Sequence, residues 1–425
     1  MADERIEVAA LPDVVRHVER VAERLAGWPE AASCYRTWVA SATRGQVVRL
    51  DEGGIHLITG DIPAMWLRDS SAQVRGLWPV VEEEPDGPFA AVVAGLIRRQ
   101  VTCLALDPYA NSFTRGETTH HRFDRPRPHR LVWERKWELD SVAYSVDLWV
   151  RWWDATGDAA PLGAEARAVV DTILGLLHDE QDPDARSRYS FRRPFATLPR
   201  GGRGPRVSPC GLVRSAFRPS DDPCHLGFHI PGNAHLVVAL RGLGRVASDV
   251  WDDADLVGEL AALADTVDDA IGREAVGDDD VLAYEVDGAG GRLFMDDANV
   301  PSLLSLPYLG WRGHDDPVVV ATRAAVLSPR NPWWVDGSVV RGIGSPHTGR
   351  GRVWPMAVAV EGLSAPDAGE ARAALERLVA LAEHLPERRL VESVDAGRPA
   401  RLTRPWFGWP NALAAELAEV VSRTL

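Results

Sequence analysis

Hydrophobic residues along most of the chain recur at steps of three and four, the spacing that places them on one face of a helix. Val14, Val18 and Val21 form the first such run. Another extends over 139–153 and ends before Gly157, a common helix stop. The same pattern predicts further helices at 30–43, 70–82, 88–105, 163–178, 231–247, 255–271, 301–309, 317–327, 354–364, 368–383 and 406–422.

Long segments rich in Gly, Pro, Arg, Asp and aromatic residues separate these helices. They lie at 107–135, 182–228, 280–300 and 328–353. Loops of this length inside a compact domain are uncommon and usually functional. Shorter runs predict β-hairpins at 46–59 and around 281–295. No Pro/Ser/Gly linker divides the chain, which predicts a single domain over 1–425, an α/α toroid of about twelve helices.

Composition narrows the classes of partner. The chain has 61 acidic and 47 basic side chains and a formal charge of -14, which argues against a nucleic-acid partner. Its 16 Trp outnumber 9 Phe and 6 Tyr. Trp rings stack on the apolar faces of sugars, but they also fill large cores. Composition alone therefore leaves carbohydrate binding open.

The chain shows neither a membrane-spanning run of apolar residues nor a signal-peptide pattern at its start, so we expect a cytoplasmic protein without a membrane partner. The four cysteines, Cys34, Cys103, Cys210 and Cys224, lack metal-type spacing. Cys210 and Cys224 are close enough in sequence to pair, although free thiols are favoured in this compartment. The sequence carries no signal for an oligomeric state.

Two loop segments contain candidate catalytic or binding residues, and each also has a purely structural interpretation. Arg68 and Asp69 come directly before an apolar helix, where Asp69 would also serve as a cap. Asp221 and Asp222 are adjacent carboxylates, and like charges close together raise each other's pKa. A carboxyl that stays protonated near neutral pH is what a general acid needs. The same Ser-Asp-Asp-Pro sequence also suits a surface turn.

Further acidic and aromatic segments fit sugar recognition better than metal binding. Asp296 and Asp297 lack the ligand spacing of a calcium loop, which favours hydrogen bonds to sugar hydroxyls. The glycines before His347 lack the strand–helix context of a phosphate loop. Glu392 sits in an apolar run. Since nucleophile-elbow, metalloprotease, Walker and dinucleotide motifs are all missing, the remaining carboxylates, Trp, Arg and His predict a glycosidase without metal or cofactor.

Six segments in order resemble glycoside hydrolase family 125, and together they cover nearly the whole chain. They are 60–70 (GDIPAMWLRDS), 135–141 (RKWELDS), 217–222 (FRPSDD), 295–304 (MDDANVPSLL), 342–348 (GIGSPHT) and the block that begins at Trp406-Phe407. The resemblance implies an all-α (α/α)6 barrel with long active-site loops and minor β-hairpins. It also implies a metal-independent, exo-acting α-mannosidase that prefers α-1,6-linked mannose and inverts the anomeric configuration.

The resemblance also implies roles for individual residues. The general acid of the family falls on Asp221 or Asp222, and the general base falls on Glu392. Asp221 is the preferred acid because Pro223 restricts the backbone of Asp222 to extended geometry. The residues expected to bind the substrate are Asp61, Trp66, Arg68, Asp69, Arg218, Asp296, Asp297, Asn299 and His347.

The chain departs from the family pattern around the expected base. Val391 and Val394 flank Glu392 and Ser393 where the family commonly has His and Phe, and Pro410 replaces a common Ala. Two alternatives to a mannosidase remain. One is another (α/α)6 sugar enzyme, such as a phosphorylase, lyase or epimerase. The other is a catalytically inactive mannoside-binding protein. A phosphorylase would need a phosphate pocket, for which the candidates are Arg203, Arg206, Arg214 and Arg218.

Overall fold

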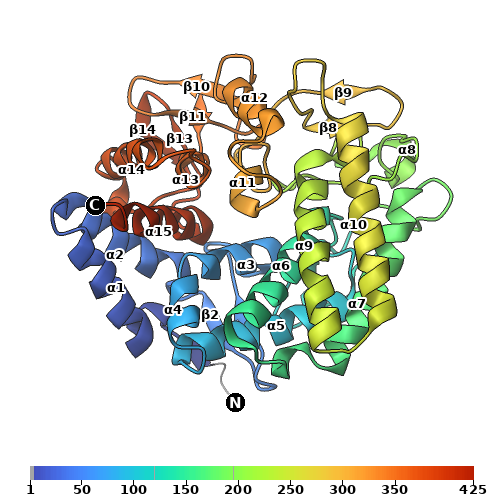
Figure 1. Ribbon diagram of the computed structural model, residues 1–425, viewed down its shortest axis with the longest axis horizontal. Coiled ribbons are helices and arrows are strands. Elements are labelled where there is room, and N and C mark those ends of the chain that lie inside the picture. Colours follow the sequence, from blue (N-terminus) through green and yellow to red (C-terminus); the bar gives the residue numbers. More distant parts are fainter. Residues whose placement is uncertain (1–3, 119, 195) are drawn as a thin grey trace.

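Helices follow one another around a ring (Figure 1), and the last of them returns beside the first. The structure, a computed structural model, describes residues 4–118, 120–194 and 196–425. Its longer helices are α1 (Pro12–Arg24), α2 (Pro29–Thr43), α3 (Leu67–Arg75), α4 (Trp78–Glu83), α5 (Pro88–Leu106), α6 (Leu139–Thr156), α7 (Ala164–Gln181), α9 (Ile230–Asp249), α10 (Ala254–Glu274), α12 (Pro317–Val326), α13 (Pro355–Leu363), α14 (Ala368–Ala382) and α15 (Gly408–Ser422). Two shorter ones are α8 (Pro199–Gly202) and α11 (Leu306–Leu309).

Deeply buried helices alternate along the chain with helices that keep one face in solvent. α3, α6, α9, α13 and α15 are buried over most of their length. α7, α10, α12 and α14 bury only a stripe. The ring closes because α15 packs against α2 and α3. This alternation of inner and outer helices confirms the predicted (α/α)6 barrel.

The predicted helix at 70–82 is divided into α3 and α4. The division follows Gly76, where a side chain would bring a Cβ atom to 2.5 Å from the Ala412 carbonyl oxygen of α15. The predicted helix at 301–309 shortens to α11. Its expected first turn is held by the Asp296 carboxylate, which accepts hydrogen bonds from the backbone N–H groups of Leu303 and Leu304.

Short strands lie in the segments before and between the helices. The predicted hairpin at 46–59 forms from β2 (Val47–Arg49) and β3 (Ile55–Leu57), and β1 (Glu4–Ile6) joins it as a third strand. The hairpin around 281–295 forms from β8 (Glu285–Val286) and β9 (Arg292–Leu293). The other strands are β4 (Met65–Trp66), β5 (Ser112–Phe113), β6 (Val132–Glu134), β7 (Phe228–His229), β10 (Trp334–Asp336), β11 (Arg341–Ile343), β12 (Arg352–Val353), β13 (Ser393–Asp395) and β14 (Arg398–Thr403).

The helix α5, predicted at 88–105, corrects the expectation that the chain has no apolar run of membrane-spanning length. Among the described residues it alone is long and apolar enough to cross a membrane by length and composition. However, 72% of its apolar window is buried inside the fold, as is common in the core of a soluble domain. Separately, Cys210 and Cys224 are free thiols in this structure.

Candidate active site

A cavity of about 410 Å³ opens at the end of the barrel where the inner helices begin. Its walls come from the segments that lead into α3, α6, α9, α13 and α15 and from the loop after β11. Seven of the predicted site residues line it: Trp66, Arg68, Asp69, Asp221, Asn299, His347 and Glu392. Five others do not line it, namely Asp61, Arg218, Asp222, Asp296 and Asp297.

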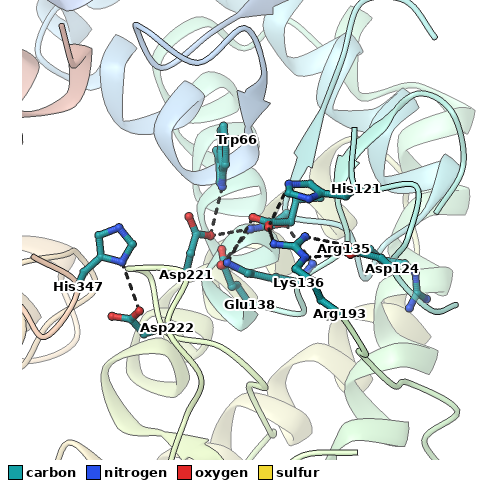
Figure 2. Close-up of polar contacts among 12 residues, drawn as sticks. Trp66, His121, Asp124, Arg135, Lys136, Glu138, Arg193, Asp221, Asp222 and His347 are labelled. Carbon is teal, nitrogen blue, oxygen red and sulfur yellow. Dashed lines mark hydrogen bonds and ion pairs between the residues drawn. The ribbon is translucent and has the colours of Figure 1, made fainter. Parts of the chain in front are cut away.

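The two adjacent aspartates point in different directions (Figure 2). Asp221 has a left-handed backbone with φ of 65°, an uncommon conformation outside glycine that the surrounding fold must hold in place. Its Oδ1 accepts hydrogen bonds from Trp66 Nε1 at 3.3 Å and Asn111 Nδ2 at 2.8 Å. Asp222 turns instead towards His347, whose Nδ1 lies 3.3 Å from its Oδ1. Of the two aspartates, only Asp221 therefore lines the cavity.

Arg218 holds this turn in place through a buried ion pair. Its Nε donates to Glu285 Oε1 at 2.6 Å, and both side chains are almost fully buried. The other Glu285 oxygen accepts from the backbone N–H groups of His225 and Leu226 at 2.7 and 2.9 Å. Arg218 thus holds the loop that carries Asp221. Because it lies outside the cavity, its expected contact with substrate is not made directly from this position.

Arg68 lies at the bottom of the cavity among carboxylates. Its Nη1 donates to Glu138 Oε2 at 2.7 Å and to Asp140 Oδ2 at 2.8 Å, and its Nε lies 3.4 Å from Asp69 Oδ2. Burial raises the pKa of Asp69 to about 6, against the opposing effect of Arg68. The guanidinium also lies 5.6 Å from the Trp409 ring. Asp69 and Arg68 therefore offer an acceptor and a donor to sugar hydroxyls.

The charge around Asp221 sets its protonation. Burial alone would raise the pKa of Asp221, but Lys136 and a hydrogen bond from Glu138 hold it well below its ordinary range. Burial also acts to lower the pKa of Lys136, and Asp221 and Glu134 outweigh that effect and raise it. Lys136 is therefore a cation beside the candidate acid. It is the only lysine in the chain.

Glu392 lies on a part of the cavity wall away from Asp221, next to the paired strands β13 and β14. It directly precedes β13, and Arg404 directly follows β14; the pairing of Ser393 with Thr403 brings the two side chains together. Arg404 Nη1 lies 3.6 Å from Glu392 Oε1. Asp61 holds the same guanidinium at 2.8 Å, so it contacts Arg404 and not the cavity.

The acidic segment before α11 braces its own loop. Asp296 accepts hydrogen bonds from two backbone N–H groups, yet burial raises its pKa to about 8. Asp297 accepts from Asn299 Nδ2 at 2.9 Å and from Ser345 Oγ at 3.2 Å. Asn299 reaches the cavity, whereas both aspartates stay behind its wall.

His347 adds a further cation to the cavity wall. Its hydrogen bond with Asp222 raises its pKa to about 9, so the ring is protonated at neutral pH. His347 Nδ1 faces Asp222, while the residue itself lines the cavity. The Asp222–His347 pair therefore presents a charged donor to the same space as Asp221.

Sequence reasoning missed several residues of the cavity. One wall carries His120, stacked on Trp133 with ring centroids 3.8 Å apart. Glu134 beside them is held by Arg193 at 2.7 Å. These residues belong to the long 107–135 segment, whose length was the only available signal. The other missed lining residues are Thr59, Ile62, His121, Lys136, Pro219, Ser220, Trp354, Arg404, Phe407 and Trp409.

Two alternative chemistries find little support in this geometry. Arg214 and Arg218, two candidates for a phosphate pocket, are both engaged in buried ion pairs, with Glu180 at 2.6 Å and Glu285 at 2.6 Å. Among the described residues, no group of three His, Cys, Asp or Glu side chains is placed to hold a metal ion.

Residues 33–419 match the family model described as metal-independent alpha-mannosidase (GH125). The chain belongs to glycoside hydrolase family 125. Its membership assigns α-mannoside hydrolysis as the family chemistry and accounts for the order of the six sequence segments.

One solved relative of the GH125 chain is itself described as a metal-independent α-mannosidase. A solved Streptococcus pneumoniae metal-independent α-mannosidase, in a non-productive complex with α-1,6-mannobiose, is 34% identical, with full coverage of both chains and a TM-score of 0.92. The Schizosaccharomyces pombe protein called meiotically up-regulated gene 157 protein is 38% identical over 388 residues, which are 85% of this chain and 75% of the relative. A Saccharomycopsis fibuligera glucoamylase shares the fold alone, with 13% identity, a TM-score of 0.59 and coverage of 99% and 98%.

Proposed function

We propose that this protein is an exo-acting α-mannosidase that removes terminal α-1,6-linked mannose from oligomannosides with inversion of configuration. The observation that carries the proposal is the pairing of Asp221 and Glu392 in one cavity, on loops far apart in sequence. The α-1,6-mannobiose bound to the Streptococcus pneumoniae relative supports the linkage.

The proposed mechanism uses Asp221 as the acid. As the bond between the anomeric carbon and the glycosidic oxygen breaks, Asp221 gives a proton to the departing oxygen. Glu392 takes a proton from the water that attacks the opposite face of the sugar. Asp221 is favoured over Asp222 because it lines the cavity, whereas Asp222 is directed to His347. Net, one water is consumed and mannose and the shortened glycan are released.

Exo action is supported by what closes the inner end of the cavity. Arg68, Asp69 and Trp409 lie at the start of buried inner helices. The barrel core behind them leaves no room for a glycan to extend beyond its terminal sugar. Trp133 and His120 stand on the wall formed by the 107–135 loop. An aromatic pair of this kind suits the apolar face of the sugar on the leaving side.

The cellular location belongs to the same proposal. We place the enzyme in the cytoplasm, where it would trim imported oligomannosides. Fractionation of cells that express the chain would test this, with activity in the soluble cytoplasmic fraction expected and activity outside the cytoplasm contradicting it.

Linkage and chain-end specificity are tested with defined substrates. Incubation with α-1,6-, α-1,3- and α-1,2-mannobiose should release mannose fastest from the α-1,6 compound. A linear α-1,6-mannotriose should give mannose and mannobiose first. Preference for another linkage, or cleavage only within longer chains, would contradict the proposal. Release of mannose 1-phosphate when phosphate is added would favour a phosphorylase.

A further inference from the structure

Glu138 is a buried carboxyl beside the candidate acid that neither the family resemblance nor the substrate contacts explain. It is the last residue before α6 and has no solvent exposure. Figure 2 shows it directly next to Asp221. Asn111 Nδ2 donates to Glu138 Oε1 at 3.0 Å and to Asp221 Oδ1 at 2.8 Å. One amide group therefore brings the two carboxyls together.

The orientation of Asn111 is fixed by its other atom. Asn111 Oδ1 accepts a hydrogen bond from the backbone N–H of Lys136 at 3.2 Å, so its Nδ2 faces the carboxyls. The second Glu138 oxygen accepts from Arg68 Nη1 at 2.7 Å. Glu138 is thus held on one side by Arg68 and on the other by Asn111, whose amide also bonds Asp221.

The surrounding charges favour a proton in this cluster. The charged groups packed around Glu138 and Asp221 are Arg68, Asp69, Glu134, Lys136, Asp140 and His347, and His347 has its own partner in Asp222. Glu134 has its own partner in Arg193 at 2.7 Å. Four buried carboxylates then share two cations, and like charges in a desolvated site are relieved by protonation. Burial and Asp221 raise the pKa of Glu138 well above its ordinary range.

We propose that Glu138 and Asp221 hold one proton between them, and that Glu138 supplies this proton through Asp221 to the departing glycosidic oxygen. The inference rests on the proposed hydrolytic function and on Asp221 as its acid. Lys136, Arg68 and the hydrogen bond from Glu138 all favour an ionised Asp221, so in the resting site the proton resides on Glu138, and without Glu138 the cluster would hold no proton to donate. Glu138 does not line the cavity and acts through Asp221, so it is a positioning residue for the proton.

The proton balance closes over one turnover. Glu138 passes the single shared proton to Asp221 as Asp221 delivers it to the departing oxygen, so both carboxyls end ionised, with Glu138 bonded to Arg68. The attacking water loses its proton to Glu392. Solvent then carries that proton away from Glu392 and returns one to the Glu138–Asp221 pair.

The test compares two substrates in Glu138→Gln and in a matched control, Asp140→Asn. α-1,6-Mannobiose needs a protonated leaving group, whereas 2,4-dinitrophenyl α-mannoside does not. Asp140 is equally buried and bonds the same Arg68 atom at 2.8 Å. Glu138→Gln should lower kcat on mannobiose at least about 100-fold and change the aryl mannoside rate by less than about tenfold. Asp140→Asn should slow both substrates by the same factor.

Equal losses on both substrates in Glu138→Gln, or no loss on mannobiose, would overturn the proposal. Failure of the wild-type enzyme on every mannoside would instead overturn the proposed function, and this shows before any variant is made. Should Glu138→Gln not fold, infrared spectra of the wild type and Asp221→Asn replace it. A protonated-carboxyl band that shifts in Asp221→Asn is expected, and a band that stays unchanged would contradict the shared proton.

Discussion

The two sides of the cavity are built differently. Asp221 stands among buried charges, with Lys136, Glu138 and Arg68 nearby and hydrogen bonds from Trp66 and Asn111. On the other side, Glu392 has one cation, Arg404, at 3.6 Å. A general acid must carry a proton at a pH where a free carboxyl has lost it, whereas a general base needs only to be ionised and to reach water. The side of the cavity that carries Asp221, with its many buried charges, is therefore the one that has to control protonation of the catalytic carboxyl.

Substitution of Glu392, on the side of the cavity with few charges, should cause the largest loss of activity. Glu392→Gln should lower kcat at least about 100-fold on α-1,6-mannobiose and on the dinitrophenyl mannoside alike, because both reactions need an activated water. Initial rates on the two substrates measure this. Glu387→Gln, at an exposed glutamate near β13, should keep the wild-type rates. A loss confined to mannobiose would remove Glu392 from the role of base.

Substitution of Asp221, on the side of the cavity with many charges, should cause a loss of activity that depends on the leaving group of the substrate. Asp221→Asn should lower mannobiose hydrolysis at least about 100-fold and affect the dinitrophenyl mannoside far less. Asp222→Asn should slow both substrates by similar factors, since it acts through His347. The ratio of the two rates in each variant is the measurement. If the dependence appears in Asp222→Asn instead, the acid has been assigned to the wrong aspartate.

Stability should also depend on the support beneath the acid. Arg218→Met should lower the free energy of unfolding by about 3–5 kcal/mol, because it leaves Glu285 buried without its ionic partner. Denaturant unfolding measures the change. Arg241→Met removes exposed pairs with Asp265 and Asp268 and should cost no more than about 1 kcal/mol. Equal losses in the two variants would mean that the buried pair does not fix the acid loop.

A smaller effect concerns the pH dependence of the Asp222–His347 pair. The pKa of His347 is raised to about 9 in the folded protein, against an ordinary value of 6.5. Folding therefore binds the proton, and the stabilisation is complete below about pH 6.5 and is lost as pH rises through 9. The gap in unfolding free energy between wild type and His347→Gln should shrink over that range. Because the pair is partly exposed, the change should be at most about 1 kcal/mol. A gap that widens with pH would contradict the assignment.

Much of the fold was predictable because helical periodicity records burial directly. The runs at 139–153 and 231–247 predicted α6 and α9 within a few residues. The failures arise where tertiary contact overrides the local pattern. Gly76 follows the last residue of α3, at a point where α15 comes too close for a side chain. The apolar run at 301–309 forms only the short α11, and Asp296 accepts hydrogen bonds from two backbone N–H groups in the irregular segment before it.

The site was predictable as a set of segments but not as a set of contacts. The resemblance named the loops that contain Asp221 and Glu392, and the structure places both side chains on the cavity wall. It did not indicate that Arg218 faces Glu285, nor that Asp61 faces Arg404. Those partners are distant in sequence, and a motif carries no information on which charge lies opposite. For the same reason, Glu138 belonged to the family-like segment 135–141 but had no predicted role.

The most direct test of the central claim is the anomer that the wild-type enzyme releases first. Time-resolved NMR of α-1,6-mannobiose hydrolysis follows the anomeric protons before mutarotation mixes them. If Glu392 activates water on the face opposite the bond that Asp221 protonates, β-mannose should accumulate first. Early accumulation of α-mannose would contradict the account, because it would make Glu392 a nucleophile and not a base.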